Sequence, residues 1–123
     1  MKYYLSGPMR GLPESNYPAF HQASDRLREA GYEVYNPAEG SDTPASEETF
    51  TGAMRTHLEQ LLTCDAVIVL PAWGRSEGAK IEVAMARAMG LPIHAYHQHR
   101  PKAQMIETLG TVKIVTRAEV IGG

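Results

Sequence analysis

Short runs of apolar residues alternate along the chain with longer stretches in which apolar residues recur every three or four positions. The short runs predict strands and the longer stretches predict helices. Strands are expected at residues 2–6, 32–35, 66–70, 92–96 and 112–115, and helices at residues 17–30, 50–63, 76–90 and 101–109. Strands that alternate with helices are typical of a parallel sheet covered by helices on both faces.

The run from Ala66 to Leu70 is the clearest strand, because every residue in it is apolar. Such a run is typical of a central parallel strand that is buried on both faces. Right-handed crossovers leave few topologies, and the commonest small one has the strand order 2-1-3-4-5. We therefore expect an α/β protein with a flavodoxin- or Rossmann-like three-layer fold and a parallel sheet of four to five strands. Its ligand crevice is expected between strands 1 and 3, beyond their carboxyl ends.

Turn signals mark both ends of the first expected helix. Asn16 is placed as its N-cap, Pro18 falls in the first turn, and Gly31 is placed at the C-terminal cap. The second expected helix directs apolar residues inward, namely Met54, Leu58, Leu61 and Leu62.

Composition narrows the class of protein. The chain has 123 residues, 43% of them apolar, which fits one domain spanning residues 1–123. The formal net charge of -2 gives no reason to expect a nucleic-acid polymer as partner. Cys64 is the one cysteine, so an intrachain disulfide and a multi-cysteine zinc site are excluded. No apolar stretch has the length of a signal peptide or membrane helix, and a cytoplasmic protein without membrane contact is expected.

Metal ligands are not expected from the histidines. His97 and His99 are spaced like a metal-binding pair, but no carboxylate or cysteine accompanies them at ligand spacing. Solvated loop histidines are the better interpretation.

Two loops that leave the expected strands 1 and 3 carry glycines, a small hydroxyl and an arginine. Backbone N–H groups at the start of a helix, with a serine and an arginine nearby, can hold an anion such as a phosphate. Loop glycines often serve tight turns alone, but the topology brings both loops to one crevice, which favours a shared binding site. The candidate binding residues are Ser6, Gly7, Pro8, Met9, Arg10, Gly11, Trp73, Ser76 and Gly78.

Glu82 has an unusual position in the third expected helix. It shares a helix face with small and apolar residues, whereas the other charged residues of that helix fall on the opposite side. A carboxylate on a packed face is costly unless it is paired or functional. Gly78, one turn earlier, leaves space above it for a ligand. Two interpretations stay open: a functional carboxylate, or a glutamate at the edge of this face that reaches solvent or pairs with Arg10 or Arg75.

Motifs in both halves of the chain carry a family resemblance. They are Tyr4-Leu5-Ser6-Gly7-Pro8-Met9-Arg10-Gly11, Asn16-Tyr17-Pro18-Ala19-Phe20, Gly31-Tyr32-Glu33-Val34, Asn36-Pro37, Cys64-Asp65-Ala66-Val67-Ile68-Val69-Leu70-Pro71, Trp73, Ser76, Gly78-Ala79 and Glu82. The chain resembles a small phage and bacterial family of the DUF4406 type, which is related to the nucleoside 2-deoxyribosyltransferases. The similarity covers nearly the whole chain, and the Ser-x-Gly-Ala-x-x-Glu pattern after a buried strand is its more specific part.

The resemblance implies an activity. Glu82 would be the nucleophile that attacks the anomeric carbon of a nucleoside or nucleotide and forms a covalent glycosyl-enzyme, with Tyr4 orienting it. In the branch that hydrolyses deoxynucleoside 5′-monophosphates, the residues matching Arg10 and Ser76 serve the phosphate. The resemblance thus implies N-glycosidic cleavage or transfer on nucleoside 5′-monophosphates more than on free nucleosides. It implies no cofactor and a homodimer or higher homo-oligomer.

One position departs from the related enzymes. Eight residues before Asp65, where relatives carry an aspartate, this chain has His57. Histidine can donate a proton near neutral pH, so His57 is either a replacement catalytic acid or a histidine at a helix edge. Trp73 either stacks on a base or is a lid residue packed on the core. The alternative function is a non-catalytic module that binds a nucleotide in the same pocket.

Overall fold

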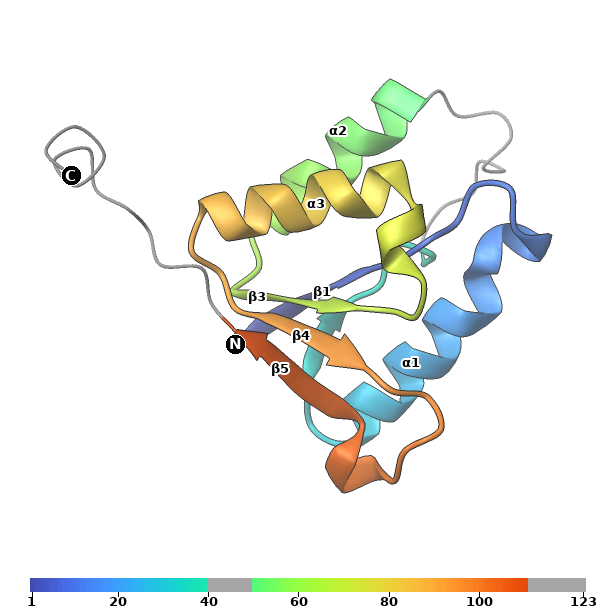
Figure 1. The fold of residues 1–123 in the computed structure, drawn as a ribbon, viewed down its shortest axis with the longest axis vertical. Helices are drawn as coiled ribbons and strands as arrows, with labels where there is room; N and C mark the ends of the chain where they lie inside the picture. The colour runs from blue at the N-terminus through green and yellow to red at the C-terminus, as the bar shows by residue number, and fades with distance from the viewer. Residues whose placement is uncertain (40–49, 111–123) are drawn as a thin grey trace, which may run out of the picture.

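A five-stranded sheet organises the described part of the protein. The structure, a computed structural model, describes residues 1–39 and 50–110. The strands are β1 (Lys2–Ser6), β2 (Glu33–Tyr35), β3 (Ala66–Val69), β4 (Ile93–Tyr96) and β5 (Ile106–Gly110), in the order β2-β1-β3-β4-β5. Four strands run parallel, and β5 pairs antiparallel with β4 (Figure 1). The predicted α/β class and strand order are confirmed.

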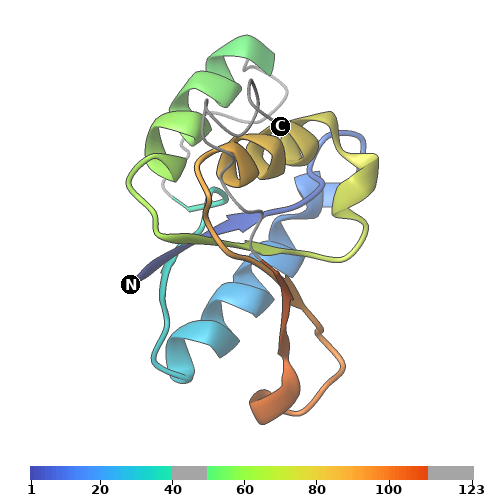
Figure 2. The ribbon, with the colours of Figure 1, turned by 60° about the vertical axis from the view of Figure 1, so that its left-hand side comes forward.

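Helices cover both faces of this sheet. Helix α1 (Tyr17–Glu29) lies on one face, and α2 (Phe50–Leu61) and α3 (Glu77–Ala88) lie on the other (Figures 1 and 2). Successive residues of a strand point to opposite faces. Leu5 therefore joins the core under α1, while Tyr4 joins the core under α2 and α3. This alternation places β1 at the centre of both cores, with β3 beside it.

The ends of α1 follow the predicted turn chemistry in part. Pro18 lies in the first turn, and Gly31 adopts a left-handed φ of 94° just after the helix. The N–H groups of Gly31 and Tyr32 donate to carbonyls of the last turn, as in a Schellman motif. Asn16 is not an N-cap by its side chain, because its Nδ2 donates to the Pro8 carbonyl at 2.9 Å. Asn16 therefore ties the loop after β1 to the start of α1.

The predicted helix at residues 101–109 is wrong. A short 3-10 helix, η3 (Lys102–Gln104), occupies its start, and β5 occupies the rest. The segment turns back on β4, with the His97 N–H donating to the Met105 carbonyl at 2.7 Å and Met105 buried in the core. The strand expected at residues 112–115 lies outside the described residues. Leu62 is also not inward as expected, because α2 ends at Leu61 and leaves Leu62 60% exposed.

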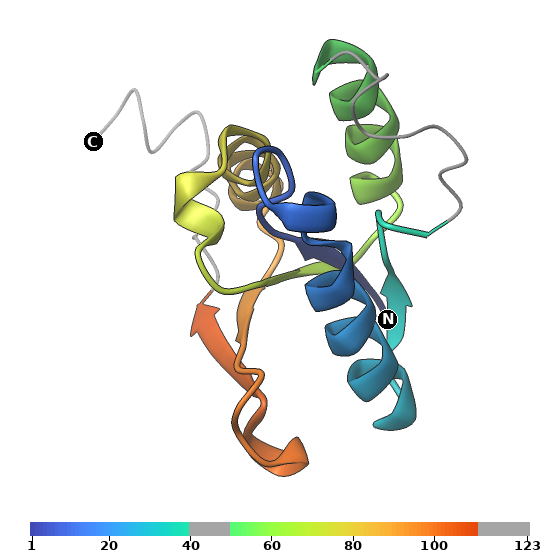
Figure 3. The ribbon, with the colours of Figure 1, turned by 90° about the vertical axis from the view of Figure 1, so that its right-hand side faces the viewer.

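Two shorter helices, η1 (Pro13–Asn16) and η2 (Trp73–Arg75), follow β1 and β3. Figure 3 shows these connections close together at the carboxyl end of the two strands. Among the described helices, none combines the length and apolar character needed to span a membrane.

Candidate active site

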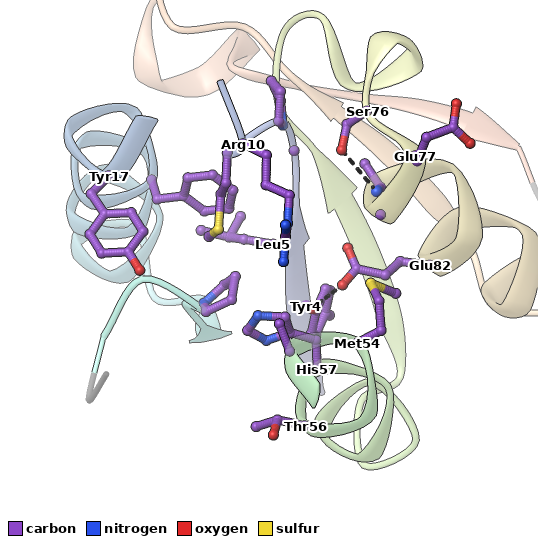
Figure 4. A pocket seen from close by; sticks show the side chains of 18 of the residues that line it. Tyr4, Leu5, Arg10, Tyr17, Met54, Thr56, His57, Ser76, Glu77 and Glu82 are labelled. Atoms are coloured by element: carbon purple, nitrogen blue, oxygen red, sulfur yellow. Dashed lines mark hydrogen bonds between the residues drawn. The ribbon is translucent and has the colours of Figure 1, made fainter. Parts of the chain in front are cut away.

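A cavity of about 610 Å³ opens at the carboxyl end of β1. Its walls come from β1 and the loop after it, the first turns of α1, the residues after β2, the middle of α2 and the first turns of α3 (Figure 4). This is the place where the strand order reverses between β1 and β3, and open α/β sheets bind ligands at such a point. The cavity therefore lies where the topology predicts a crevice.

Glu82 is the acidic group at the floor of this cavity. It comes from the second turn of α3 and is 6% exposed. The Tyr4 hydroxyl donates to its Oε2 at 2.5 Å, and the Ser6 hydroxyl donates to its Oε1 at 2.7 Å. Tyr4 and Ser6 are two residues apart on β1, so their side chains share the face that α3 covers. The carboxylate is thus held by two hydroxyl donors, one on each oxygen.

The pKa of Glu82 reflects opposing effects. Burial raises this pKa to about 7, while the hydrogen bonds from Tyr4 and Ser6 act to lower it. Burial and the neighbouring carboxylate also raise the pKa of Tyr4 well above 10.0, so Tyr4 keeps its proton and remains a donor. A carboxyl group with such a pKa changes its charge near neutral pH, which suits chemistry at that pH.

Aromatic stacking fixes the Tyr4 ring. The Tyr35 ring of β2 stacks on it with a centroid distance of 5.4 Å and an interplanar angle of 19°. Tyr4 is fully buried, whereas Tyr35 is partly exposed and also lines the cavity. Burial raises the pKa of Tyr35 as well, so the wall beside Glu82 is aromatic and neutral.

The start of α3 forms the opposite wall. Ser76 is the N-cap, and its Oγ accepts the Ala79 N–H at 3.1 Å, which leaves the hydroxyl proton available for donation to a ligand. Ser76 and Gly78 line the cavity together with Arg75. The N-terminal end of a helix favours negative charge, so this wall can hold an anion.

The loop after β1 approaches β3 closely. A Cβ on Gly7 would lie 2.9 Å from the Leu70 Cβ, so only glycine fits there without a shift of the backbone. Gly7, Pro8, Met9 and Arg10 are predicted binding residues, and all four line the cavity. In Figure 4 the side chains of Arg10 and Glu82 extend into the same cavity.

His57 also lies at this cavity. It comes from α2, is half-buried, and lines the wall beside Met54 and Thr56. Figure 4 shows its ring beside Tyr4, on the α2 side of Glu82. The structure therefore brings the three predicted catalytic residues, Glu82, Tyr4 and His57, to one cavity.

Three of the predicted binding residues do not line the cavity: Ser6, Gly11 and Trp73. Ser6 is fully buried and directs its hydroxyl at Glu82. Gly11 lies in the turn beyond Arg10 and is exposed, with a φ of 80°. Trp73 is half-buried and packs against the core under α3.

Sequence reasoning missed one wall of the cavity. Tyr17 and Phe20 of α1, together with Tyr35 and Pro37 around the end of β2, form an aromatic and apolar wall. The signal was present, because the carboxyl ends of parallel strands meet at one edge of a sheet, and Asn36-Pro37 directly follows β2.

A hydrogen bond and an ion pair hold the segment after β2. Asn36 accepts the Ala38 N–H at 2.9 Å, and Arg28 forms a two-pronged contact with Glu39, with both N–O distances at 2.7 Å. This ion pair lowers the pKa of Glu39. Pro37 and Glu39 are thereby fixed at the rim of the cavity.

In the described ranges, no three or more His, Cys, Asp or Glu side chains cluster to hold a metal ion.

Comparisons with known proteins agree with this fold. The family described as "Domain of unknown function (DUF4406)" matches residues 1–95. No curated protein sequence matches the chain. A solved structure of a 2-deoxyribosyltransferase from the psychrotolerant bacterium Bacillus psychrosaccharolyticus superposes with a TM-score of 0.61 at 21% identity, covering 78% of this chain and 72% of that one. The chain therefore belongs to the DUF4406 family, and its fold is similar to that of this 2-deoxyribosyltransferase.

Proposed function

We propose that the protein cleaves or transfers the N-glycosidic bond of nucleoside 5′-monophosphates or nucleosides, with Glu82 as the nucleophile. The observation that carries this proposal is a buried carboxylate at a cavity floor, held by Tyr4 and Ser6. The structural similarity to a 2-deoxyribosyltransferase supports a fold suited to this chemistry.

The reaction follows from this arrangement. One Glu82 oxygen attacks the anomeric carbon, and the bond to the base breaks with its electron pair leaving on the base nitrogen. His57, which lines the α2 wall of the cavity, is the proposed donor of the proton that the departing base needs. The developing positive charge on the sugar is stabilised by the carboxylate below it. Water then completes hydrolysis, or a second base completes transfer.

The two ends of the cavity suit the two ends of a nucleotide. Ser76 and Arg10, with the N-terminal end of α3, provide donors and positive charge for a 5′-phosphate. The opposite wall, with Tyr17 and Tyr35, provides aromatic faces for a base. A nucleoside 5′-monophosphate therefore fits the site better than a free nucleoside.

A second candidate function is a nucleotide-binding module without turnover. The observation that favours it is that both oxygens of Glu82 already accept a hydrogen bond within the protein. Under this alternative the carboxylate would only orient the sugar hydroxyls.

Trapping the covalent intermediate distinguishes the two. Wild-type protein is mixed with a deoxynucleoside 5′-monophosphate, quenched with acid within one turnover, and measured by intact-protein and peptide mass spectrometry. A deoxyribose phosphate adduct on the peptide containing Glu82, absent from Glu82→Gln, supports the enzyme. Tight binding without adduct or released base supports the binding module.

A further inference from the structure

Ser6 was expected to bind the ligand, but it lies behind the cavity surface. It is fully buried, it does not line the cavity, and its hydroxyl lies 2.7 Å from Glu82 Oε1. Its main-chain neighbour across the sheet is Val69 of β3, so the backbone at Ser6 is fixed by sheet pairing. The Ser6 side chain therefore reaches the carboxylate from a rigid strand.

A buried carboxylate needs such donors to stay ionised. Burial disfavours the charged form, and each hydroxyl that donates to the carboxylate favours it. Tyr4 donates to Oε2 and Ser6 donates to Oε1, so each oxygen has its own donor. Because Tyr4 and Ser6 both project from β1, one strand sets the position of both oxygens.

Other titratable and charged groups line the same cavity as Glu82. They are Tyr35 from β2, His57 from α2, Tyr17 from α1, Glu39 after β2, Arg10 from the loop after β1, and Arg75 and Glu77 at the start of α3. The Ser6 hydroxyl donates to Glu82 Oε1, so we expect its removal to change this one contribution and to leave the other groups in place.

We propose that Ser6 is a positioning residue, whose hydroxyl favours the ionised form of the Glu82 carboxyl group and fixes the orientation of Oε1 toward the sheet. Its consequence for catalysis rests on the proposed function, whereas its effect on the carboxylate does not. Ser6→Ala keeps the Cβ and the strand, but leaves Oε1 buried without the donor that the structure gives it.

The direct test is a titration of the Glu82 carboxyl carbon by NMR on uniformly labelled free protein, with the signal assigned by its loss in Glu82→Gln. A hydrogen bond to a charged group has an effect of about one to two pH units on the midpoint, so Ser6→Ala should titrate that much higher than wild type. Ser6→Thr retains a hydroxyl and should return the midpoint toward the wild-type value. Ser6→Cys, a weaker donor, serves where threonine prevents folding and should give an intermediate midpoint.

Ser24→Ala is the matched control. Ser24 is equally buried, lies in α1 on the other side of the sheet, and its Oγ has no hydrogen-bond partner in the described part of the chain. Its removal should leave the Glu82 midpoint unchanged. An unchanged midpoint in folded Ser6→Ala would overturn the inference.

The pH profile of base release separates this inference from the proposed function. If the wild type releases base, the acid limb of the profile should move upward in Ser6→Ala together with the carboxyl midpoint. If the wild type releases no base but the midpoint still moves, the inference stands and the proposed function fails. If base is released and neither midpoint nor acid limb moves, the inference alone fails.

Discussion

At Glu82, the requirements of stability and of chemistry conflict, because burial of a charged carboxylate is unfavourable for folding. Burial raises its pKa to about 7, although two hydroxyls favour its charged form. A side chain selected for packing alone would be apolar at this place in α3, because its neighbours in the core are Val83 and Ala86. The presence of a carboxylate there is therefore best explained by what it does to a ligand.

The difference in unfolding free energy between wild type and Glu82→Gln should depend on pH. The folded-state pKa is about 7 and the ordinary value is 4.5, so the folded protein binds more protons than the unfolded chain between these values. The contribution of Glu82 to stability is full below pH 4.5 and is lost as the pH rises toward 7. The unfolding free energy of Glu82→Gln, compared with that of wild type, should therefore be on the order of 1–3 kcal/mol higher above this pH window than below it. Urea unfolding across the window measures this.

Glu77→Gln is the control for that experiment. Its side chain is 77% exposed and pairs with Lys80, so its change should not reproduce the pH dependence. A stability difference between wild type and Glu82→Gln that stays constant with pH would show that Glu82 does not change protonation in this range.

His57→Ala tests the source of the proton for the departing base. General acids contribute roughly 10²–10⁴-fold, so base release should slow by at least about 10²-fold. A nucleotide analogue whose leaving group needs no proton should be affected much less. Both rates are measured by chromatography, with exposed His99→Ala as control. Equal losses for both substrates would assign His57 to binding instead.

Residue patterns predicted part of the site. Glu82 and Tyr4 follow from a carboxylate on a packed helix face and from the family resemblance, and both reach the cavity. Strand alternation predicts that Ser6 shares the face of Tyr4, but it does not reveal that the Ser6 hydroxyl reaches Glu82 from outside the cavity lining. Both interpretations of Trp73 stay predictions, because its half-buried ring packs against the core outside the cavity lining.

At the scale of elements, the exits of β1 and β3 determine the shape of the cavity. Gly7 and Leu70 follow the paired ends of these strands, and the Leu70 N–H donates to the Ser6 carbonyl at 2.8 Å. The close approach brings the loop after β1 next to the start of α3. Gly7 therefore determines both the turn after β1 and the shape of the cavity wall that this loop forms.

Gly7→Ala should destabilise the protein. The added Cβ would meet the Leu70 Cβ at 2.9 Å, and the stem of a side chain cannot move without its backbone. Overpacking of this kind costs about 1–3 kcal/mol. Gly74→Ala is the matched control, since nothing lies within 4 Å of its added Cβ. Denaturant unfolding measures both variants, and equal stability of the two would contradict this account.

Element prediction succeeded where periodicity was long and failed where tertiary contacts decided. The three helices have apolar faces at helical spacing and end at residues close to their predicted ends. For residues 101–109 the helix prediction fails, because pairing with β4 and burial of Met105 determine the conformation of this segment. Arg26 adds to this by donating to the carbonyls of Gln98 and Arg100, which holds the connection between β4 and β5 against α1.

For the whole molecule, the strand order explains why distant residues meet. Tyr4 and Glu82 are far apart in sequence, yet β1 lies beside β3, and α3, which follows β3, lies over the same face of the sheet (Figure 1). The order was predictable from right-handed crossovers, and the cavity lies where that order reverses. Association into a homodimer or higher homo-oligomer stays a prediction from the resemblance.

The most direct test of the central claim is base release from a panel of ribo- and deoxyribonucleoside 5′-monophosphates and the matching free nucleosides, followed by chromatography. Wild type should release base, with monophosphates preferred over nucleosides, and folded Glu82→Ala should release none. Thermal stabilisation by a nucleotide without any base release would contradict the enzymatic account and leave a nucleotide-binding module. Undiminished release by Glu82→Ala would contradict the assignment of Glu82 as the nucleophile.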